Sequence, residues 1–407
     1  MDKKLMVLAV TSVFAAPVFG QASNVTLYGR ANLGISTYQA TGAAAGSAAD
    51  FKSKPVVFDS GSRLGVRGVE DLGGGLRAIF QIESGVNIDT GNAQGQGGQN
   101  NNSSGFLGSR PSFVGLEGGF GRVTFGRQDV WWGNGTIMQT GANYVNTDIP
   151  FLTGSAGRVN AGIARQSNVL QYTTPTFGGA NATLSYQPNS EGAAAGANVD
   201  ARNYGVTARW AGGPISAQID WSEVKAATPV APAVQATNKN LKGSVGFTYM
   251  PGAQISVLGM QLKNLNVPGV AGLAALDDDL KQTFFAVSWE HAFGNIQALA
   301  QFGQGGKISG CTEAATTTCD NTKTRAFMLG GRYNMSKRTA VYLTYNQITN
   351  QANATMDYVG GSVTSANNGV PAVGATSSGL ATPVGGVPAG SAGADPRIIA
   401  LGVWHQF

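Results

Sequence analysis

Apolar and polar residues alternate along much of this chain. From residue 215 to 222 the sequence reads Ile-Ser-Ala-Gln-Ile-Asp-Trp-Ser, so every second side chain is apolar. The segments 25–35, 181–187 and 241–249 alternate in the same way. Successive side chains of a β-strand point to opposite faces, so a period of two indicates strands with one apolar and one polar face.

Extended along the chain, the pattern predicts sixteen strands. They begin near residues 25, 62, 76, 108, 121, 168, 180, 201, 215, 240, 253, 280, 294, 324, 339 and 396. Short turns alternate with longer loops, and we place the short turns at 71–75, 118–120, 175–179, 212–214, 251–252, 293–294 and 334–338. An even number of strands with short turns at one end and long loops at the other is typical of an antiparallel transmembrane β-barrel.

The strand length also fits a bilayer. Ten residues that rise about 3.3 Å each, tilted by about 40°, span roughly 25 Å, the height of the apolar band of such barrels. A secreted soluble β-sandwich or β-solenoid also has alternating strands and is the alternative. The strand count, the alternation of loop lengths and polar faces rich in Ser, Thr, Asn, Gln and Arg, without packed aliphatic side chains, favour the barrel.

Composition narrows the class further. The chain has 407 residues, 59 of them glycine, with 27 basic and 22 acidic side chains. Its charged fraction of 12% is about half the usual value, which speaks against a nucleic-acid-binding protein. A soluble chain of this length normally divides into two or three domains, whereas a hollow barrel needs no central core.

The first 22 residues have the pattern of a signal peptide. Lys3 and Lys4 precede a short apolar stretch, and small residues follow at 20–22. A membrane anchor is the alternative, but an apolar stretch of about fifteen residues interrupted by Pro17 is short for a span. We therefore expect export, removal of residues 1–22 and a single barrel domain over 23–407.

Two predicted loops differ in character. Residues 352–395 consist mainly of Gly, Ala, Ser, Thr and Val and predict a low-complexity surface loop. The segment 131–165 is rich in aromatic and aliphatic residues and needs a surface to pack on. We expect it to fold into the barrel and narrow the pore, with an outward cap or a subunit contact as the alternative.

The sequence offers little for catalysis or for cofactors. Cys311 and Cys319, the only cysteines, are expected to form a loop disulfide, because two thiols without a nearby histidine fall short of a metal site. No nucleophile–base motif, phosphate-binding loop or Cys/His cluster is present, and the two histidines lie near predicted strand ends. We expect no enzyme activity, no cofactor and no metal.

Several separated motifs resemble the general porins of β-proteobacteria. They are the run Ser-Arg-Leu-Gly-Val-Arg-Gly-Val-Glu-Asp-Leu-Gly from residue 62, Val-Thr-Leu-Tyr-Gly from 25, Gly-Arg-Val-Thr-Phe-Gly-Arg-Gln from 121, Tyr-Thr-Thr-Pro from 172, Asn-Met-Ser-Lys-Arg-Thr-Ala-Val-Tyr from 334 and the terminal Phe407. The resemblance implies a sixteen-stranded, all-β outer-membrane barrel of a Gram-negative bacterium. It also implies a homotrimer, a third long loop folded into each pore, and passive diffusion of small hydrophilic solutes.

Strand parity places several arginines inside this barrel. Leu64 and Val66 share the apolar parity, which leaves Arg63 and Arg67 facing the lumen, and the same reasoning turns Arg30 and Arg77 inward. Clustered arginines in a narrow pore favour anions, although each one could equally be an ordinary solvated charge of the wall.

The resemblance adds positions that parity does not supply. Anion-selective relatives carry constriction arginines at places that resemble Arg63, Arg110 and Arg165. Within the segment 131–165, Asp148 and Arg158 are further candidates to set the field, but a lone loop aspartate is as often a turn former or a solvated charge.

Together these features predict a water-filled channel for small hydrophilic solutes and inorganic anions, with weak to moderate anion preference, held in outer-membrane lipid. A secreted adhesive or structural β-protein without channel activity is the alternative, and an outer-membrane enzyme is a weaker one.

Overall fold

In the computed structural model the described residues are 23–42, 51–86, 88–89, 107–131, 135–138, 165–188, 202–225, 237–267, 278–311, 319–354, 356 and 393–407. Within them, seventeen strands form one antiparallel sheet. Their bounds are β1 Ser23–Thr41, β2 Phe51–Asp59, β3 Arg63–Gly73, β4 Leu76–Gly85, β5 Ser112–Gly118, β6 Gly121–Asp129, β7 Arg165–Thr173, β8 Ala180–Gln187, β9 Asn203–Gly212, β10 Ile215–Lys225, β11 Thr237–Met250, β12 Ala253–Val267, β13 Asp278–Phe293, β14 Ile296–Gly305, β15 Thr324–Asn334, β16 Thr339–Asn350 and β17 Asp395–Gln406.

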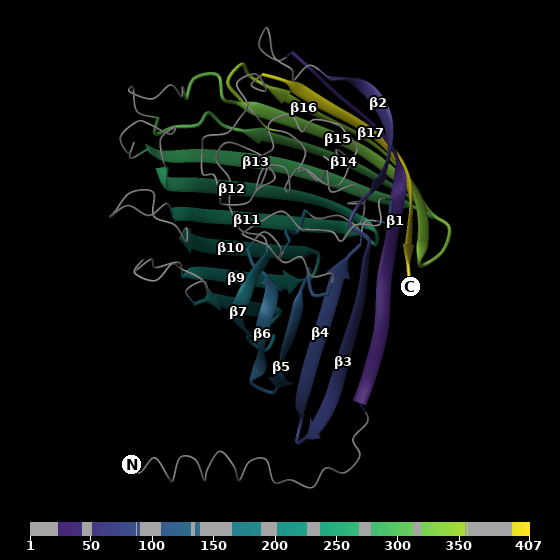
Figure 1. The fold of residues 1–407 in the computed structure, drawn as a ribbon, viewed down its shortest axis with the longest axis vertical. Helices are drawn as coiled ribbons and strands as arrows, with labels where there is room; N and C mark the ends of the chain where they lie inside the picture. The colour runs from purple at the N-terminus through teal and green to yellow at the C-terminus, as the bar shows by residue number, and fades with distance from the viewer. Residues whose placement is uncertain are drawn as a thin grey trace.

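The sheet closes on itself, as Figure 1 shows. From β3 onward each strand pairs with the next in sequence, and β17 returns to pair with β1, from Arg30 opposite Gln406 to Thr41 opposite Asp395. The predicted antiparallel barrel is therefore confirmed. No helix among the described residues is long and apolar enough to cross a bilayer.

Two of the strands share one position in the wall. β1 pairs with β3 along its first half and with β2 along its second half. Residues 60–62 separate β2 from β3, and there the Asn32 side chain donates to the carbonyl of Ser60 at 2.9 Å while the Asn32 amide donates to the Ser62 hydroxyl at 2.9 Å. β2 and β3 thus act as a single interrupted strand, which gives the described barrel the sixteen wall positions that the sequence predicts.

The structure differs from the prediction in one additional strand and in the start of another. The sequence pattern does not predict β2, and β5 begins at Ser112 instead of near residue 108. Pro111 precedes β5 and has no N–H to donate to a ladder, which accounts for the later start. The predicted short turns are present; in the one between β3 and β4, Gly74 and Gly75 have φ of 60° and 80°, a conformation that favours glycine.

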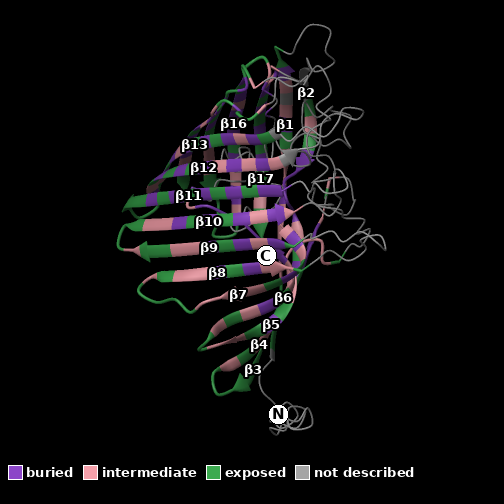
Figure 2. Ribbon diagram, turned by 90° about the vertical axis from the view of Figure 1, so that its left-hand side faces the viewer, coloured by how far each residue is buried: buried purple, intermediate pink, exposed green. Residues whose placement is uncertain are grey.

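The outer face of the wall is apolar and exposed. Along β10–β13 in Figure 2, exposed and buried residues alternate, and the exposed ones are mostly large hydrophobic side chains. On β1, for instance, Val25 and Leu27 are 62% and 63% exposed. A continuous apolar band of this kind marks a surface that meets lipid.

The inner face is not uniformly polar, contrary to the sequence-based expectation. On β12–β17 it carries buried apolar side chains, among them Leu258, Phe284, Met328 and Ile398. Their neighbours along each strand point outward and are exposed, so parity places the buried set inside the barrel. One side of the lumen wall therefore mixes apolar side chains with uncharged polar ones such as Ser288, Gln301 and Asn346, and the charged groups described below lie mainly on the other side.

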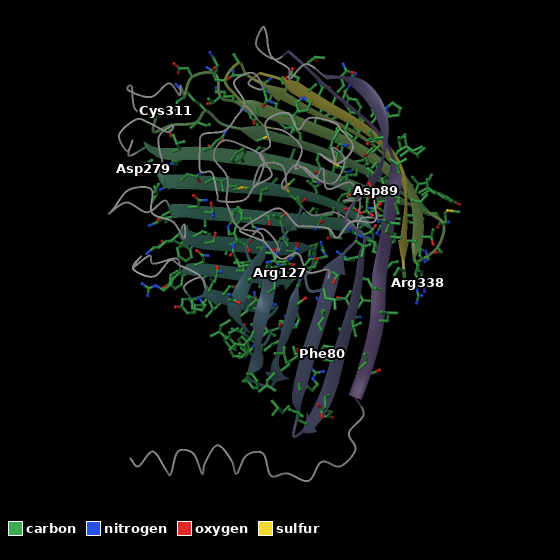
Figure 3. All side chains as sticks on the ribbon, in the orientation of Figure 1. Phe80, Asp89, Arg127, Asp279, Cys311 and Arg338 are labelled. Carbon is green, nitrogen blue, oxygen red and sulfur yellow. A yellow bond between two sulfur atoms is a disulfide. The ribbon has the colours of Figure 1, made fainter. Side chains whose placement is uncertain are left out.

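The two ends of the barrel differ. Figure 3 shows Asp279 and Cys311 at the end that carries the longer connections and Arg338, in the short turn between β15 and β16, at the opposite end. Cys311 and Cys319 are joined by a disulfide at the long-loop end. Most of the predicted surface loop 352–395 lies outside the described residues.

Candidate functional site

Four of the predicted arginines come together on one side of the wall. Arg30 on β1 lies directly opposite Arg63 on β3, Arg110 shortly precedes β5, and Arg165 begins β7. Arg165 lies close enough to Arg110 for the two guanidinium groups to repel each other. Like charges placed side by side are unfavourable, so acceptors must lie among them.

Glu83 on β4 is the central acceptor. Its carboxylate accepts a hydrogen bond from Nε of Arg110, lies 3.9 Å from Nε of Arg63, and accepts a hydrogen bond from the Tyr28 hydroxyl at 3.0 Å. Only 8% of the Glu83 side chain is exposed, against 30% for Arg63. Glu83 therefore holds two arginines in place while Arg63 keeps the larger exposed surface.

A second carboxylate serves the other end of the cluster. Nε of Arg165 donates to Oδ1 of Asp129 at 2.7 Å. Beside this pair, Arg127, labelled in Figure 3, donates to the carbonyl of Ser109 at 3.0 Å and to the hydroxyl of Ser167 at 2.8 Å. Because these partners of Arg127 are neutral, its charge adds to the positive field.

Two further predicted arginines of the wall, Arg30 and Arg67, have neutral partners as well, whereas Arg77 pairs with Glu117. Arg30 donates to the carbonyls of Ser60 and Gly61, at the interruption between β2 and β3, at 2.8 to 3.2 Å. Arg67 lies over the ring of Tyr28, with Cζ 5.2 Å from the ring centroid. On β3, Arg67 lies four residues beyond Arg63 toward the short turn that follows Gly73.

The charges of this site do not cancel. We call it the arginine cluster; it consists of Arg30, Arg63, Arg110, Arg127 and Arg165. Among the described residues, the carboxylates that interact with it are Asp59, Glu83 and Asp129, so within that part of the chain positive charges outnumber negative ones by two. Low-dielectric walls concentrate such a field in the pore.

The chain that follows β6 contacts the opposite part of the inner wall. The Trp131 indole donates to the carbonyl of Asp220 on β10 at 3.3 Å, and the Ile137 amide donates to the Ser244 hydroxyl on β11 at 3.1 Å. Gln301 on β14 donates to the carbonyl of Met138 at 3.4 Å. Residues 139–164, which include the candidates Asp148 and Arg158, lie outside the described residues.

Lys242 on β11 is central to these contacts. Its ammonium donates to the carbonyls of Trp131 and Gly135, each at 2.6 Å, and lies 4.8 Å from the Trp131 ring centroid. Asp220 stands 3.5 Å away, and both side chains of this ion pair are 1% exposed. The Asp220 carboxylate also accepts hydrogen bonds from Thr207 and Gln218. We call Lys242 and Asp220 the latch.

Sequence reasoning did not single out the acidic partners or the latch. Glu83 shares its parity with Gln81, while Ile82 between them is outward and exposed, so the parity argument used for Arg63 could have found it. Lys242 alternates with the exposed Leu241 and Val245, so the same argument places it on the inner face, whereas Asp129 and Arg127 carried no such signal. Among the described residues, no group of three His, Cys, Asp or Glu side chains could hold a metal ion.

Comparison with known proteins agrees with this architecture. The sequence matches the Gram-negative porin family over residues 5–353. It is 27% identical to the major outer membrane protein P.IB of Neisseria gonorrhoeae over 355 residues, which covers 84% of this chain and 92% of that protein. Among solved structures, the anion-selective porin from Comamonas acidovorans is similar with a TM-score of 0.65 and 24% identity, covering 95% of this chain and all of that one. OmpT of Vibrio cholerae in its trimer form is similar in fold, with a TM-score of 0.60, 13% identity and coverage of 95% and 100%.

Proposed function

This chain belongs to the Gram-negative porin family and is an outer-membrane channel without enzymatic activity, and we propose that its pore prefers anions over cations. The arginine cluster carries this proposal, since its five positive charges exceed the three negative charges that interact with it in the described part of the chain. Guanidinium groups stay charged at any working pH, so the preference does not depend on titration of these groups. The anion selectivity named for the Comamonas acidovorans porin supports the same reading.

The preference is weak to moderate because Glu83, Asp129 and Asp59 offset part of the positive charge. The expected solutes are inorganic anions and small hydrophilic molecules that diffuse passively through the water-filled pore. In a planar bilayer under a KCl gradient, we expect the reversal potential to have the sign of chloride permeation. A potential of the opposite sign would contradict the proposal.

Salt should weaken this selectivity. The Debye length falls from about 10 Å at 0.1 M to about 3 Å at 1 M, so the field of the cluster reaches less of the pore cross-section at high salt. We expect the ratio of chloride to potassium permeability to fall toward one as the mean KCl concentration rises at a constant gradient. A ratio independent of salt would instead point to discrimination by size.

We further propose that the segment 131–165 folds into the lumen and narrows it. Support comes from Trp131, Gly135 and Ile137, whose backbone or side-chain groups bond to inward-facing residues of β10 and β11. A segment that crosses from β6 to the opposite wall reduces the open cross-section of the pore. Passing ions and solutes are then brought close to the arginine cluster.

Protease protection tests this placement. Trypsin added to intact cells should not cut after Arg158, because an inward segment is shielded by the wall. Cutting after Lys307, whose side chain is 53% exposed at the long-loop end, serves as the control that the enzyme reaches the surface loops. Efficient cleavage at Arg158 in intact cells would favour an outward cap.

Trimer formation is proposed by analogy with OmpT of Vibrio cholerae, an outer membrane protein whose similar structure is a trimer form. We expect an unheated detergent extract to contain a species three times the mass of the heated chain when measured by light scattering. A monomeric mass under conditions that preserve channel activity would contradict this part of the proposal.

A further inference from the structure

A hollow lies on the inner wall between the arginine cluster and the short-turn end of the barrel. Its volume is about 540 Å³, within the range of small-molecule sites, and residues of β1 and β3–β6 line it. Bacterial barrels keep their short turns on the periplasmic side, so this hollow opens toward the periplasm.

A row of alternating charges borders the hollow on its periplasmic side. Strand register places Asp71, Arg77, Glu117 and Arg122 next to one another across β3, β4, β5 and β6. Arg77 and Glu117 form an ion pair. Arg122 ends this row, and among the described residues it has no carboxylate within ion-pair distance.

The floor of the hollow is apolar. Val69 on β3 lies opposite Ile79 on β4, and Phe113 on β5 lies opposite Gln81, two residues further along. All three apolar side chains share the parity of Arg63 and Arg67 and so face inward, whereas Val114, next to Phe113, is outward and 60% exposed.

Arg67 borders the hollow on the side of the cluster. It pairs in register with Thr26 of β1 and Gln81 of β4 and has no carboxylate partner within the described part of the chain. The hollow therefore combines an apolar floor with guanidinium groups at both ends, Arg67 on one side and Arg122 on the other.

We infer that this hollow binds small organic anions that carry an apolar body, such as aromatic carboxylates, on their way through the pore. The apolar body covers Val69, Ile79 and Phe113, and the carboxylate pairs with Arg67 or Arg122. A wholly hydrophilic anion would leave the floor in contact with water, and a neutral aromatic would leave both guanidinium groups unpaired. The inference rests on the proposed anion channel and adds a solute class to it.

Blockade of single channels tests this site. Benzoate added on the periplasmic side of a channel bathed in KCl should cause brief interruptions of the current. Acetate lacks the aromatic ring and benzyl alcohol lacks the carboxylate. Each should require at least about tenfold higher concentrations for the same blockade. Equal potency of benzoate and acetate would overturn the role of the floor, and equal potency of benzoate and benzyl alcohol would overturn the role of the arginines.

Variants locate the effect. Phe113→Asn should raise the half-blocking concentration of benzoate about tenfold, whereas Phe113→Leu, which keeps an apolar floor, should change it little. The double variant R67Q/R122Q should weaken benzoate blockade by a similar factor, and Arg325→Gln, an exposed arginine at the long-loop end, is the charge control. Normal resistance to heat denaturation in detergent shows that each variant has folded. Unchanged blockade in both Phe113→Asn and R67Q/R122Q would overturn the site.

Failure of the proposed benzoate site can be distinguished from failure of the proposed anion preference. If the wild-type reversal potential in a KCl gradient shows no chloride preference, the proposed function fails whatever benzoate does. If chloride preference is present and benzoate blocks no better than acetate, the channel proposal stands and the binding site is wrong.

Discussion

Replacing Arg63, Arg110 and Arg165 together by glutamine is expected to turn the channel from anion-preferring to cation-preferring. The arginine cluster and its carboxylates carry two net positive charges, and the triple variant would carry one net negative charge. A single charge about 5 Å from a passing ion contributes about 0.8 kcal/mol at the dielectric constant of water, a factor of about four in occupancy before screening. The reversal potential under a KCl gradient should therefore change sign.

Glu83 provides the matched variant with the opposite effect. Glu83→Gln removes the carboxylate between Arg63 and Arg110 while keeping the size of the side chain and an acceptor for the Tyr28 hydroxyl. We expect a stronger anion preference, with folding checked by a normal resistance to heat denaturation in detergent. Movement of the triple variant and of Glu83→Gln in the same direction would show that the measured selectivity arises elsewhere in the pore.

Breaking the latch is expected to widen the pore. Lys242→Met removes two short hydrogen bonds from a charged donor to the carbonyls of Trp131 and Gly135, each worth about 1.5 to 3 kcal/mol. Asp220 would also lose its buried ion-pair partner. Both losses favour release of the segment 131–165 from the inner wall of the barrel. The unitary conductance should therefore rise and become noisier.

Two companion variants separate this effect from general destabilisation. Lys242→Met combined with Asp220→Asn removes both buried charges and retains an acceptor for Thr207, so the barrel should tolerate it better, as is common when both members of a buried pair are replaced. The conductance should remain high in this double variant. Lys239→Met, on the same strand, breaks a more exposed ion pair with Glu223 and should leave conductance unchanged. A normal unitary conductance in both Lys242 variants would show that the latch does not set the pore width.

Strand parity could be read from the sequence because side-chain direction alternates along a strand whatever its neighbours are. It put Arg30, Arg63 and Arg67 on one face of the sheet, in agreement with their strand register, and it located sixteen of the seventeen strands. It missed β2, where Pro55 lies within the strand. Among the described residues β2 pairs with β1 alone, and a strand paired on one side tolerates proline.

Parity fails where the register changes. Between β6 and β7 the pairing shifts after Gly126, and Asn168 takes a positive φ of 59° there. β7 advances three residues, from Gln166 to Val169, where β6 advances two, so counting by twos cannot be carried across this point to Arg165 and its partner Asp129. The pairing of Asp129 with Arg165 therefore became visible only in the folded barrel.

Local pattern was thus enough for most of the strands, for the apolar outer face and for grouping several arginines on one face, since each depends on neighbours in the sequence. The charge balance of the site and the attachment of the segment after β6 depend on which distant residues meet. Glu83 and Arg110 are 27 residues apart, and Lys242 is 111 residues from Trp131. Closure of the sheet brings these groups together, and no period along the chain encodes which partner each one meets.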